Sequence, residues 1–240
     1  MKKIILFIGI IFAISTIAYT QGDENIFYDK IHSLVKSDNT RQAIRLLKKR
    51  ISEDKTNYIA MIELGNVYVD MGKKKHAFKL YKKAVKINPD YPDSHFFLGR
   101  LYFQMQKFEN ITSEFDIFRA KTRSFSELDD TEKNVYIKKL YYIGDVYFNL
   151  KKYPNMKLIV DEILKINPND QYGYYNLGVY YYMYKRSRSK AYEIFQKVID
   201  INPHSEAARD ARYAIEFMRN NPDPRLTPDF SFIDRLDEEY

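Results

Sequence analysis

The chain has 240 residues, of which 45% are hydrophobic and 30% are charged, and it contains 22 tyrosines, 16 phenylalanines and no cysteine. This apolar and aromatic content is enough for a packed core and argues against general disorder. Without cysteine, disulfides, thiolate metal sites, a catalytic thiol and acylation at a lipoprotein cysteine are all excluded. The formal net charge of +7 is mild, and the basic residues are spread along every second predicted helix, so no nucleic-acid partner is expected.

Residues 1–22 have the pattern of an export signal. Lys2 and Lys3 precede an apolar run that begins at Ile4 and ends at Ala18. This run is shorter than the roughly 20 apolar residues that cross a bilayer, so we predict a cleaved signal peptide, with an uncleaved anchor as the alternative. The sequence therefore predicts an exported protein of the bacterial periplasm or cell envelope. It would contact a membrane only through this segment, if the segment stays uncleaved.

Residues 58–91 set a residue spacing that recurs downstream. Large and small side chains occupy fixed positions in this stretch, which closes with Asn-Pro: Met61, Leu64, Gly65, Tyr68, Ala77, Tyr81, Ala84 and Pro89. The pattern resembles the tetratricopeptide repeat, a helix-turn-helix motif of about 34 residues whose copies stack into a solenoid. The resemblance implies an all-α fold, a right-handed α-solenoid of such units with a C-terminal capping helix.

Comparison with this unit divides the rest of the chain. The Leu64-Gly65 pair returns as Leu98-Gly99, Ile143-Gly144 and Leu177-Gly178. The predicted segments are a degenerate repeat at 24–57, repeats at 58–91, 92–125, 137–170 and 171–205, an insertion at 126–136, a capping helix at 206–220 and a Pro-containing tail at 221–240.

Helix caps are predicted at the insertion and before the last helix. We expect Ser126 or Thr131 to cap a helix that runs from the insertion directly into the next repeat. Ser205 is expected to cap the final helix, which should cover the open side of the last repeat.

No catalytic constellation is visible in the sequence. His32, His76, His95 and His204 lie in four different units, with no spacing suited to a metal ion. Lone histidines on such helices are expected at the surface or only partly packed. The sequence therefore predicts a protein that is not an enzyme and that carries no catalytic residues, no metal and no cofactor.

The resemblance also implies where a partner binds. In tetratricopeptide proteins the first helices of successive repeats line the inside of the array, and partners usually lie there. Carried over to this sequence, this predicts a concave groove that binds a partner protein or peptide and makes the chain an interaction scaffold. The predicted groove residues are Asn66, Arg100, Phe103, Tyr141, Asp145, Phe148, Tyr175 and Tyr182.

The exposure of the groove aromatics decides what could bind there. For Phe96 and Phe103, packing in the core and exposure in the groove remain open alternatives. The tyrosines are expected to be exposed, because Tyr combines a flat apolar face with a polar tip suited to a wet interface. The alternative function is a carbohydrate-binding subunit or an envelope enzyme accessory, in which these rings stack on the sugars of a cell-wall polymer.

The tail at 230–240 mixes aromatic and acidic side chains. Two alternatives stay open for this tail: it folds back into the groove or onto the last helices, or it is a disordered terminus.

Overall fold

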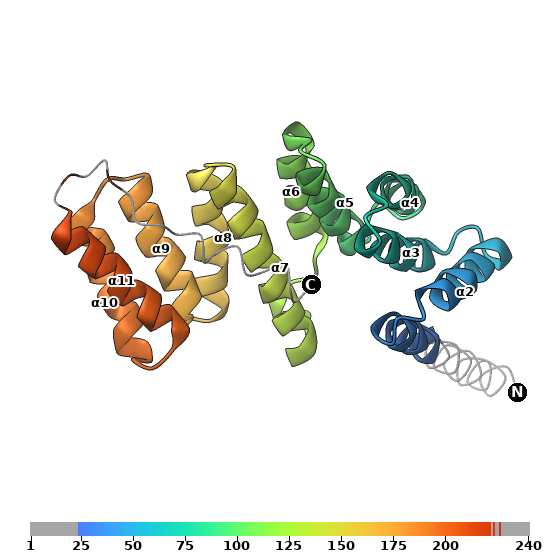
Figure 1. The fold of residues 1–240 in the computed structure, drawn as a ribbon, viewed down its shortest axis with the longest axis horizontal. Coiled ribbons are helices and arrows are strands. Elements are labelled where there is room, and N and C mark those ends of the chain that lie inside the picture. Colours follow the sequence, from blue (N-terminus) through green and yellow to red (C-terminus); the bar gives the residue numbers. More distant parts are fainter. Residues whose placement is uncertain (1–23, 222, 224–225, 227–240) are drawn as a thin grey trace, which may run out of the picture. The chain divides into compact units, whose positions relative to one another are not determined.

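A computed structural model describes residues 24–221, 223 and 226 of the chain. All regular secondary structure in this part is helical, which confirms the predicted all-α fold (Figure 1). Contacts divide the chain at Thr122 and Arg123 into two compact units, which we call unit 1 and unit 2. The predicted signal segment and tail residues 227–240 lie outside the described residues.

Unit 1 is a series of antiparallel helix pairs joined by short turns. In Figure 1, α3 and α4 lie side by side as one such pair. The helical residues 24–36 are followed by α2 (Thr40–Glu53), α3 (Tyr58–Asp70), α4 (Lys74–Ile87), α5 (Pro92–Gln104), the 3-10 turn η1 (Phe108–Asn110) and α6 (Ile111–Lys121).

Close approach of α3 and α4 depends on Gly65. A Cβ atom built on Gly65 would lie 2.3 Å from Cε1 of the Tyr81 ring, a distance that real Cβ atoms do not reach. The ring therefore rests directly on the backbone of α3, and only glycine leaves room for it. Ala77 and Ala84 on α4 are fully buried, so small side chains line the crossing from both helices.

The turn between the two helices of a pair uses left-handed backbone. Between α3 and α4 this residue is Gly72, with φ of 69°, for which glycine carries no steric cost. The other helix pairs place residues with a side chain in this conformation, and their φ values lie between 53° and 59°: Asp38, Gln106, Lys151 and Arg186. Among the described helix pairs, only the one at 58–91 thus has glycine, the residue that this turn favours.

Unit 2 begins with a 3-10 turn, η2 (Phe125–Glu127), and a long helix. Its helices are α7 (Asp130–Asn149), α8 (Tyr153–Ile166), α9 (Gln171–Met183), α10 (Arg188–Ile201) and α11 (Glu206–Asn220). As expected, α7 runs from the insertion directly into the next repeat. The predicted cap, Ser126 or Thr131, is wrong, because the cap is Asp129. Its side chain accepts a hydrogen bond from the backbone N–H of Glu132, and the Glu132 side chain accepts one from the backbone N–H of Asp129.

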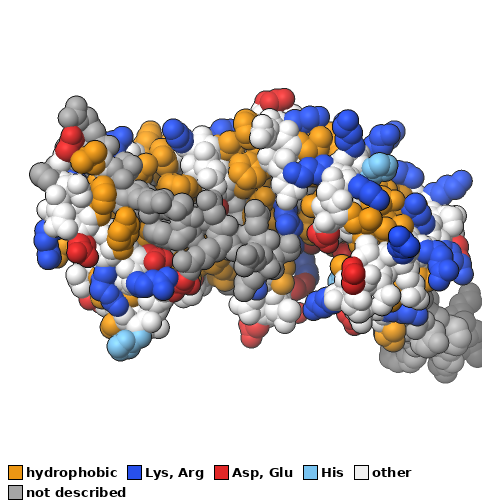
Figure 2. Space-filling model, in the orientation of Figure 1, with side chains coloured by type: hydrophobic (Ala, Val, Ile, Leu, Met, Phe, Trp, Pro, Cys, Tyr) orange, Lys and Arg blue, Asp and Glu red, His pale blue; other side chains and the backbone are white. Residues whose placement is uncertain are grey.

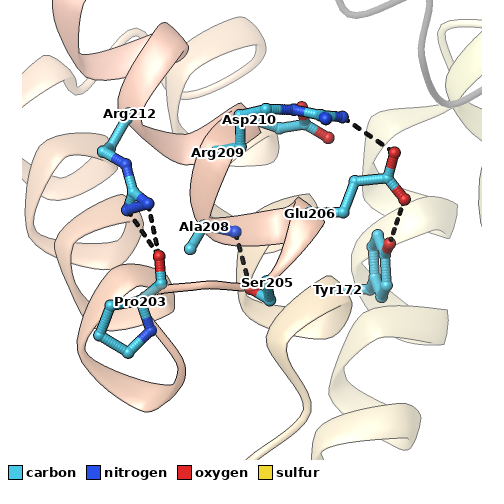
Figure 3. Close-up of polar contacts among 8 residues, drawn as sticks. All are labelled: Tyr172, Pro203, Ser205, Glu206, Ala208, Arg209, Asp210 and Arg212. Atoms are coloured by element: carbon cyan, nitrogen blue, oxygen red, sulfur yellow. Dashed lines mark hydrogen bonds and ion pairs between the residues drawn. The ribbon is translucent and has the colours of Figure 1, made fainter.

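Polar contacts at the N-terminus of α11, drawn in Figure 3, connect this helix to the preceding loop and to α9. Ser205 accepts a hydrogen bond from the backbone N–H of Ala208 at 3.0 Å, which confirms the predicted cap. Arg212 donates to the carbonyl oxygen of Pro203. Glu206 lies 2.9 Å from Arg209 and accepts a 3.5 Å hydrogen bond from the hydroxyl of Tyr172 on α9. The apolar face of α11 completes a core cluster with α9 and α10.

Candidate binding surface

Asn66 is held in one orientation by the neighbouring helix. It lies half-buried on α3, where its Oδ1 accepts a hydrogen bond from the hydroxyl of Tyr81 at 2.6 Å. Tyr81 is 2% exposed, and burial raises the pKa of its hydroxyl, which therefore donates at neutral pH. Because Oδ1 is engaged on the α4 side, Nδ2 is the group that Asn66 offers elsewhere.

Arg100 occupies the place of Asn66 one repeat later, half-buried on α5. Burial raises the pKa of the Asp70 carboxyl on α3, and the positive charge of Arg100 acts in the opposite direction. The same positive charge lowers the pKa of Tyr81 and so opposes the effect of burial. Asp70, Tyr81 and Arg100 therefore lie within electrostatic range of one another, and Tyr81 is hydrogen-bonded to Asn66. We call these four residues the unit-1 polar group.

Two phenylalanines on α5 differ in exposure. Phe96 is 1% exposed and packs with its ring centroid 5.3 Å from that of Phe118, so it belongs to the core. Phe103 is half-buried, and its ring centroid lies 6.4 Å from that of Phe108 on η1, which is 43% exposed. Of the two, Phe103 is the one that keeps an accessible apolar surface.

In unit 2, Tyr141 on α7 is hydrogen-bonded to the residue that caps the start of α9. Its hydroxyl donates to Oδ1 of Asp170, and the same oxygen accepts the backbone N–H of Gly173 at 2.7 Å as the cap of α9. The ring meets Tyr172 edge-on, with centroids 6.1 Å apart. Tyr141 is therefore half-buried, with its polar tip committed to a helix cap.

The other two predicted residues on α7 lie one and two turns further on. Asp145 is buried, with 9% exposure. Phe148 is half-buried, and its ring begins a chain of aromatic contacts through Tyr153 to Tyr184, with successive centroids 6.1 Å apart. Tyr184 is 47% exposed. The repeat spacing assigns no role to Tyr153 or Tyr184, so sequence reasoning missed this cluster.

The predicted exposure of Tyr175 and Tyr182 on α9 is wrong, since each is only 2% exposed. Tyr175 packs with its ring centroid 5.4 Å from that of Phe195, and burial raises the pKa of its hydroxyl. Tyr182 donates a 2.5 Å hydrogen bond to the carbonyl oxygen of Leu226, which lies beyond the end of α11. Both rings belong to the cluster that α11 completes. Their assignment to a binding groove stays a prediction.

His95 on α5 is more deeply packed than expected, with 4% exposure. Its Nε2 lies 3.0 Å from the carbonyl oxygen of Pro89, and its Nδ1 lies 2.8 Å from Oε2 of Glu114 on α6. These two contacts join the loop before α5 to α6 and make His95 a structural residue.

Residues 24–221, 223 and 226 bring together no group of three or more His, Asp or Glu side chains that could hold a metal ion. None of the helices that the structure describes combines the length and apolar character of a membrane span.

Comparison with known sequences identifies the repeats. Models of the tetratricopeptide repeat match residues 65–106 and 172–205. A TPR repeat-containing protein of Methanocaldococcus jannaschii is 27% identical over 165 residues, which cover 68% of this chain and 28% of that protein. The chain thus spans little more than a quarter of this relative's length.

Comparison with solved structures gives the same fold. YrrB, described as a TPR protein with an unusual peptide-binding site, is 21% identical, with a TM-score of 0.57 over 78% of this chain and 90% of that chain. A tetratricopeptide repeat protein from Parabacteroides merdae is 18% identical, with a TM-score of 0.63 over 81% of this chain and 72% of that chain. At these identities the likeness shows the fold alone.

Proposed function

We propose, on the premise that this chain carries tetratricopeptide repeats, that it is a non-enzymatic scaffold holding a protein or peptide partner on the first helices of its repeats. The fold supports this function because repeated helix pairs present an extended surface of similar helices to a long ligand. The structurally similar YrrB is described as having a peptide-binding site, which agrees with a peptide ligand for this fold.

The observation that carries the proposal is the unit-1 polar group. Asn66 and Arg100 occupy the same place in consecutive repeats, and each side chain carries N–H donors at a half-buried position. Tyr81 fixes the first donor through its hydrogen bond to Asn66. An extended peptide offers carbonyl oxygens at regular intervals, so donors repeated from helix to helix suit its backbone.

Partly exposed aromatic rings supply the apolar part of the surface. Phe103 follows Arg100 by three residues on α5, which places the two side chains on one helix face. In unit 2, Tyr141 and Phe148 are the half-buried aromatics on α7. Rings of this kind serve as anchors at protein interfaces, because they bury a large area with few rotatable bonds.

A photo-crosslinking experiment tests the proposal. A benzophenone amino acid is placed at Phe103, and at Tyr192 on α10 as the control, which is 46% exposed. We expect adducts with a partner at position 103 but not at 192, and we expect Asn66→Ala and Arg100→Ala to abolish them. Equal adducts at both positions, or adducts that persist in both alanine variants, would contradict the assignment of the unit-1 surface.

A sugar ligand is the second candidate. The observation that favours it is Tyr172, whose ring is 47% exposed and lies edge-on to Tyr141. Soluble cell-wall fragments should then quench tyrosine fluorescence in the wild type and not in a Tyr172→Ala variant. Equal quenching in the Tyr172→Ala variant would contradict a sugar site at this ring.

We also propose that the protein is exported to the periplasm or cell envelope. This rests on Lys2 and Lys3, the apolar run after them, and the absence of cysteine for lipid attachment. Mass spectrometry of the N-terminus of protein recovered from a periplasmic fraction should show cleavage within residues 18–22. A cytoplasmic pool of full-length protein would contradict this localisation.

A further inference from the structure

Two rows of basic side chains lie on the second helices of the first two repeats. Arg41, Arg45, Lys48 and Lys49 on α2 lie 34 residues, one repeat period, before Lys75, Lys79, Lys82 and Lys83 on α4. All eight side chains are exposed. Blue side chains gather over and around α4 in the space-filling view of Figure 2. The repeat therefore carries the same basic row twice on consecutive second helices, and we call the two rows the outer basic face.

The lysines of α4 form a continuous stripe. Lys75, Lys79, Lys82 and Lys86 are separated by four, three and four residues, a spacing that keeps side chains on one face of a helix. At a rise of about 1.5 Å per residue the stripe is about 16 Å long. Such a stripe presents several positive charges to one surface at the same time.

These charges are not neutralised by neighbouring residues. No acidic residue lies between Lys73 and Ile87. Among the described residues, no hydrogen bond or ion pair engages Lys75, Lys79, Lys82 or Lys83.

The second helices of unit 2 are arranged differently. Lys157 on α8 pairs with Asp161 at 2.7 Å, and Lys190 on α10 pairs with Glu193 at 2.7 Å. Unpaired lysines at this spacing repel one another and weaken a helix. On α4 that repulsion is tolerated without an acidic partner on the helix, and the contact of Lys82 with the ring of Phe78, 5.6 Å from its centroid, leaves the charge in place. This points to an external anion.

The basic row ends after two repeats. One period after the α4 row, the corresponding residues are Glu109, Ser113, Asp116 and Ile117. A general excess of lysine in the chain does not explain this change from basic to acidic and neutral residues, since such an excess would have placed lysines in the third repeat as well. The outer basic face is therefore confined to α2 and α4.

We propose that the outer basic face is a docking surface for a membrane of anionic phospholipids. The α4 row consists only of lysines, compact point charges that do not require the paired geometry with which arginine recognises single carboxylates or phosphates. None of these lysines is held in place by a hydrogen bond to another described residue, which suits a diffuse anionic surface. The apolar run from Ile4 to Ala18 precedes α2 in the sequence, so the basic face lies in the part of the chain that follows the predicted signal segment. This surface is separate from the proposed partner site on the first helices.

The test uses vesicle sedimentation with the full chain. Vesicles of phosphatidylcholine are compared with vesicles in which a third of the lipid is phosphatidylglycerol, at low and at high salt. The test variant carries four Lys→Gln changes on α4, at Lys75, Lys79, Lys82 and Lys83. The control variant removes the same charge from exposed lysines of unit 2, at Lys138, Lys151, Lys165 and Lys185.

We expect the wild type and the control variant to bind the anionic vesicles at low salt and to be released by high salt. The α4 variant should bind them about tenfold or more weakly. Binding to phosphatidylcholine alone measures the contribution of residues 1–22, which all three proteins share. Circular dichroism should be the same for the three proteins, because glutamine is a good helix former.

Three results would overturn the proposal. Undiminished binding of the α4 variant would show that these lysines do not contact the lipid. An equal loss in the control variant would show a general effect of net charge. Binding of polyglutamate or of a DNA duplex through the α4 lysines, without binding to the anionic vesicles, would assign the face to a different class of anionic partner.

Discussion

The helix pairs α3–α4 and α7–α8 each have a glycine at the equivalent position of the first helix, but the two glycines are packed differently. In the first pair a Cβ on Gly65 would lie 2.3 Å from the ring of Tyr81. In the second, a Cβ on Gly144 would meet only Cγ2 of Ile159, at 3.7 Å, which is an ordinary contact. The residue in the place of Tyr81 in that repeat is Val160, which has no ring to lay on the glycine. The same glycine is therefore required by packing in one pair and not in the other.

The difference extends to the candidate binding surface. In α3–α4 the ring that rests on Gly65 also carries the hydroxyl that holds Asn66. In α7–α8 the residue in the place of Asn66 is Asp145, which is buried, and Val160 has no hydroxyl to offer. In unit 1, Tyr81 thus serves both the packing of α3 against α4 and the orientation of Asn66 at the proposed site. In α7–α8 no single side chain serves both purposes.

The largest effect is expected from Tyr81→Ala. Removing a fully buried ring leaves a cavity between α3 and α4, which should destabilise unit 1 by about 3–5 kcal/mol. Hydrogen exchange followed by mass spectrometry should show faster exchange in α3 and α4, because it reports local opening. Val160→Ala is the matched control and should cost less, since fewer atoms are removed. Equal losses in the two variants would contradict the difference between the pairs.

Gly65→Ala should have the next largest effect. The added methyl group must displace the Tyr81 ring or separate the helices, an overpacking cost of about 1–3 kcal/mol. Thermal unfolding and exchange of α3 amides measure this loss. Gly178→Ala should behave in the same way, because its Cβ would lie 2.6 Å from the ring of Phe195. Unchanged exchange in both variants would show that the rings can move aside.

The fold could be predicted because the repeat spacing is a local property of the sequence. Leu64-Gly65 and its copies are found by counting residues, and each marks a helix that is buried against its neighbour. The cap of α7 was also present in the sequence, as Asp129 followed three residues later by Glu132, a capping-box pattern. It was missed because Ser126 and Thr131 are equally good caps by residue type alone.

Exposure of the candidate site could not be predicted in the same way. Tyr175 and Tyr182 occupy places on α9 that the repeat pattern assigns to the groove. In the structure both rings are buried in the cluster that α11 completes, and the carbonyl oxygen of Leu226 accepts a hydrogen bond from the Tyr182 hydroxyl. Periodicity gives the face on which a residue lies, but not which later segment covers that face.

Tyr81→Phe separates packing from hydrogen bonding. The ring stays on Gly65, and only the hydroxyl bonded to Asn66 is lost, so the stability of unit 1 should fall by about 1 kcal/mol. The side chain of Asn66 is then free to rotate, and crosslinking at position 103 should weaken if that donor binds the partner. Tyr192→Phe on α10 is the control at an exposed tyrosine. Undiminished crosslinking in Tyr81→Phe would show that the orientation of Asn66 does not matter for binding.

Gly144→Ala is the smallest change and the one expected to stabilise the protein. Gly144 lies within α7, where alanine is a better helix former than glycine. Its added Cβ would make one ordinary contact with Ile159, so no overpacking offsets the reduced entropy of the unfolded chain. The expected gain is about 0.4–1 kcal/mol, measured as slower exchange of the α7 amides and a higher midpoint of thermal unfolding. A loss of stability would mean that α7 and α8 approach each other as closely as α3 and α4, and the glycines of the two pairs would then serve the same purpose.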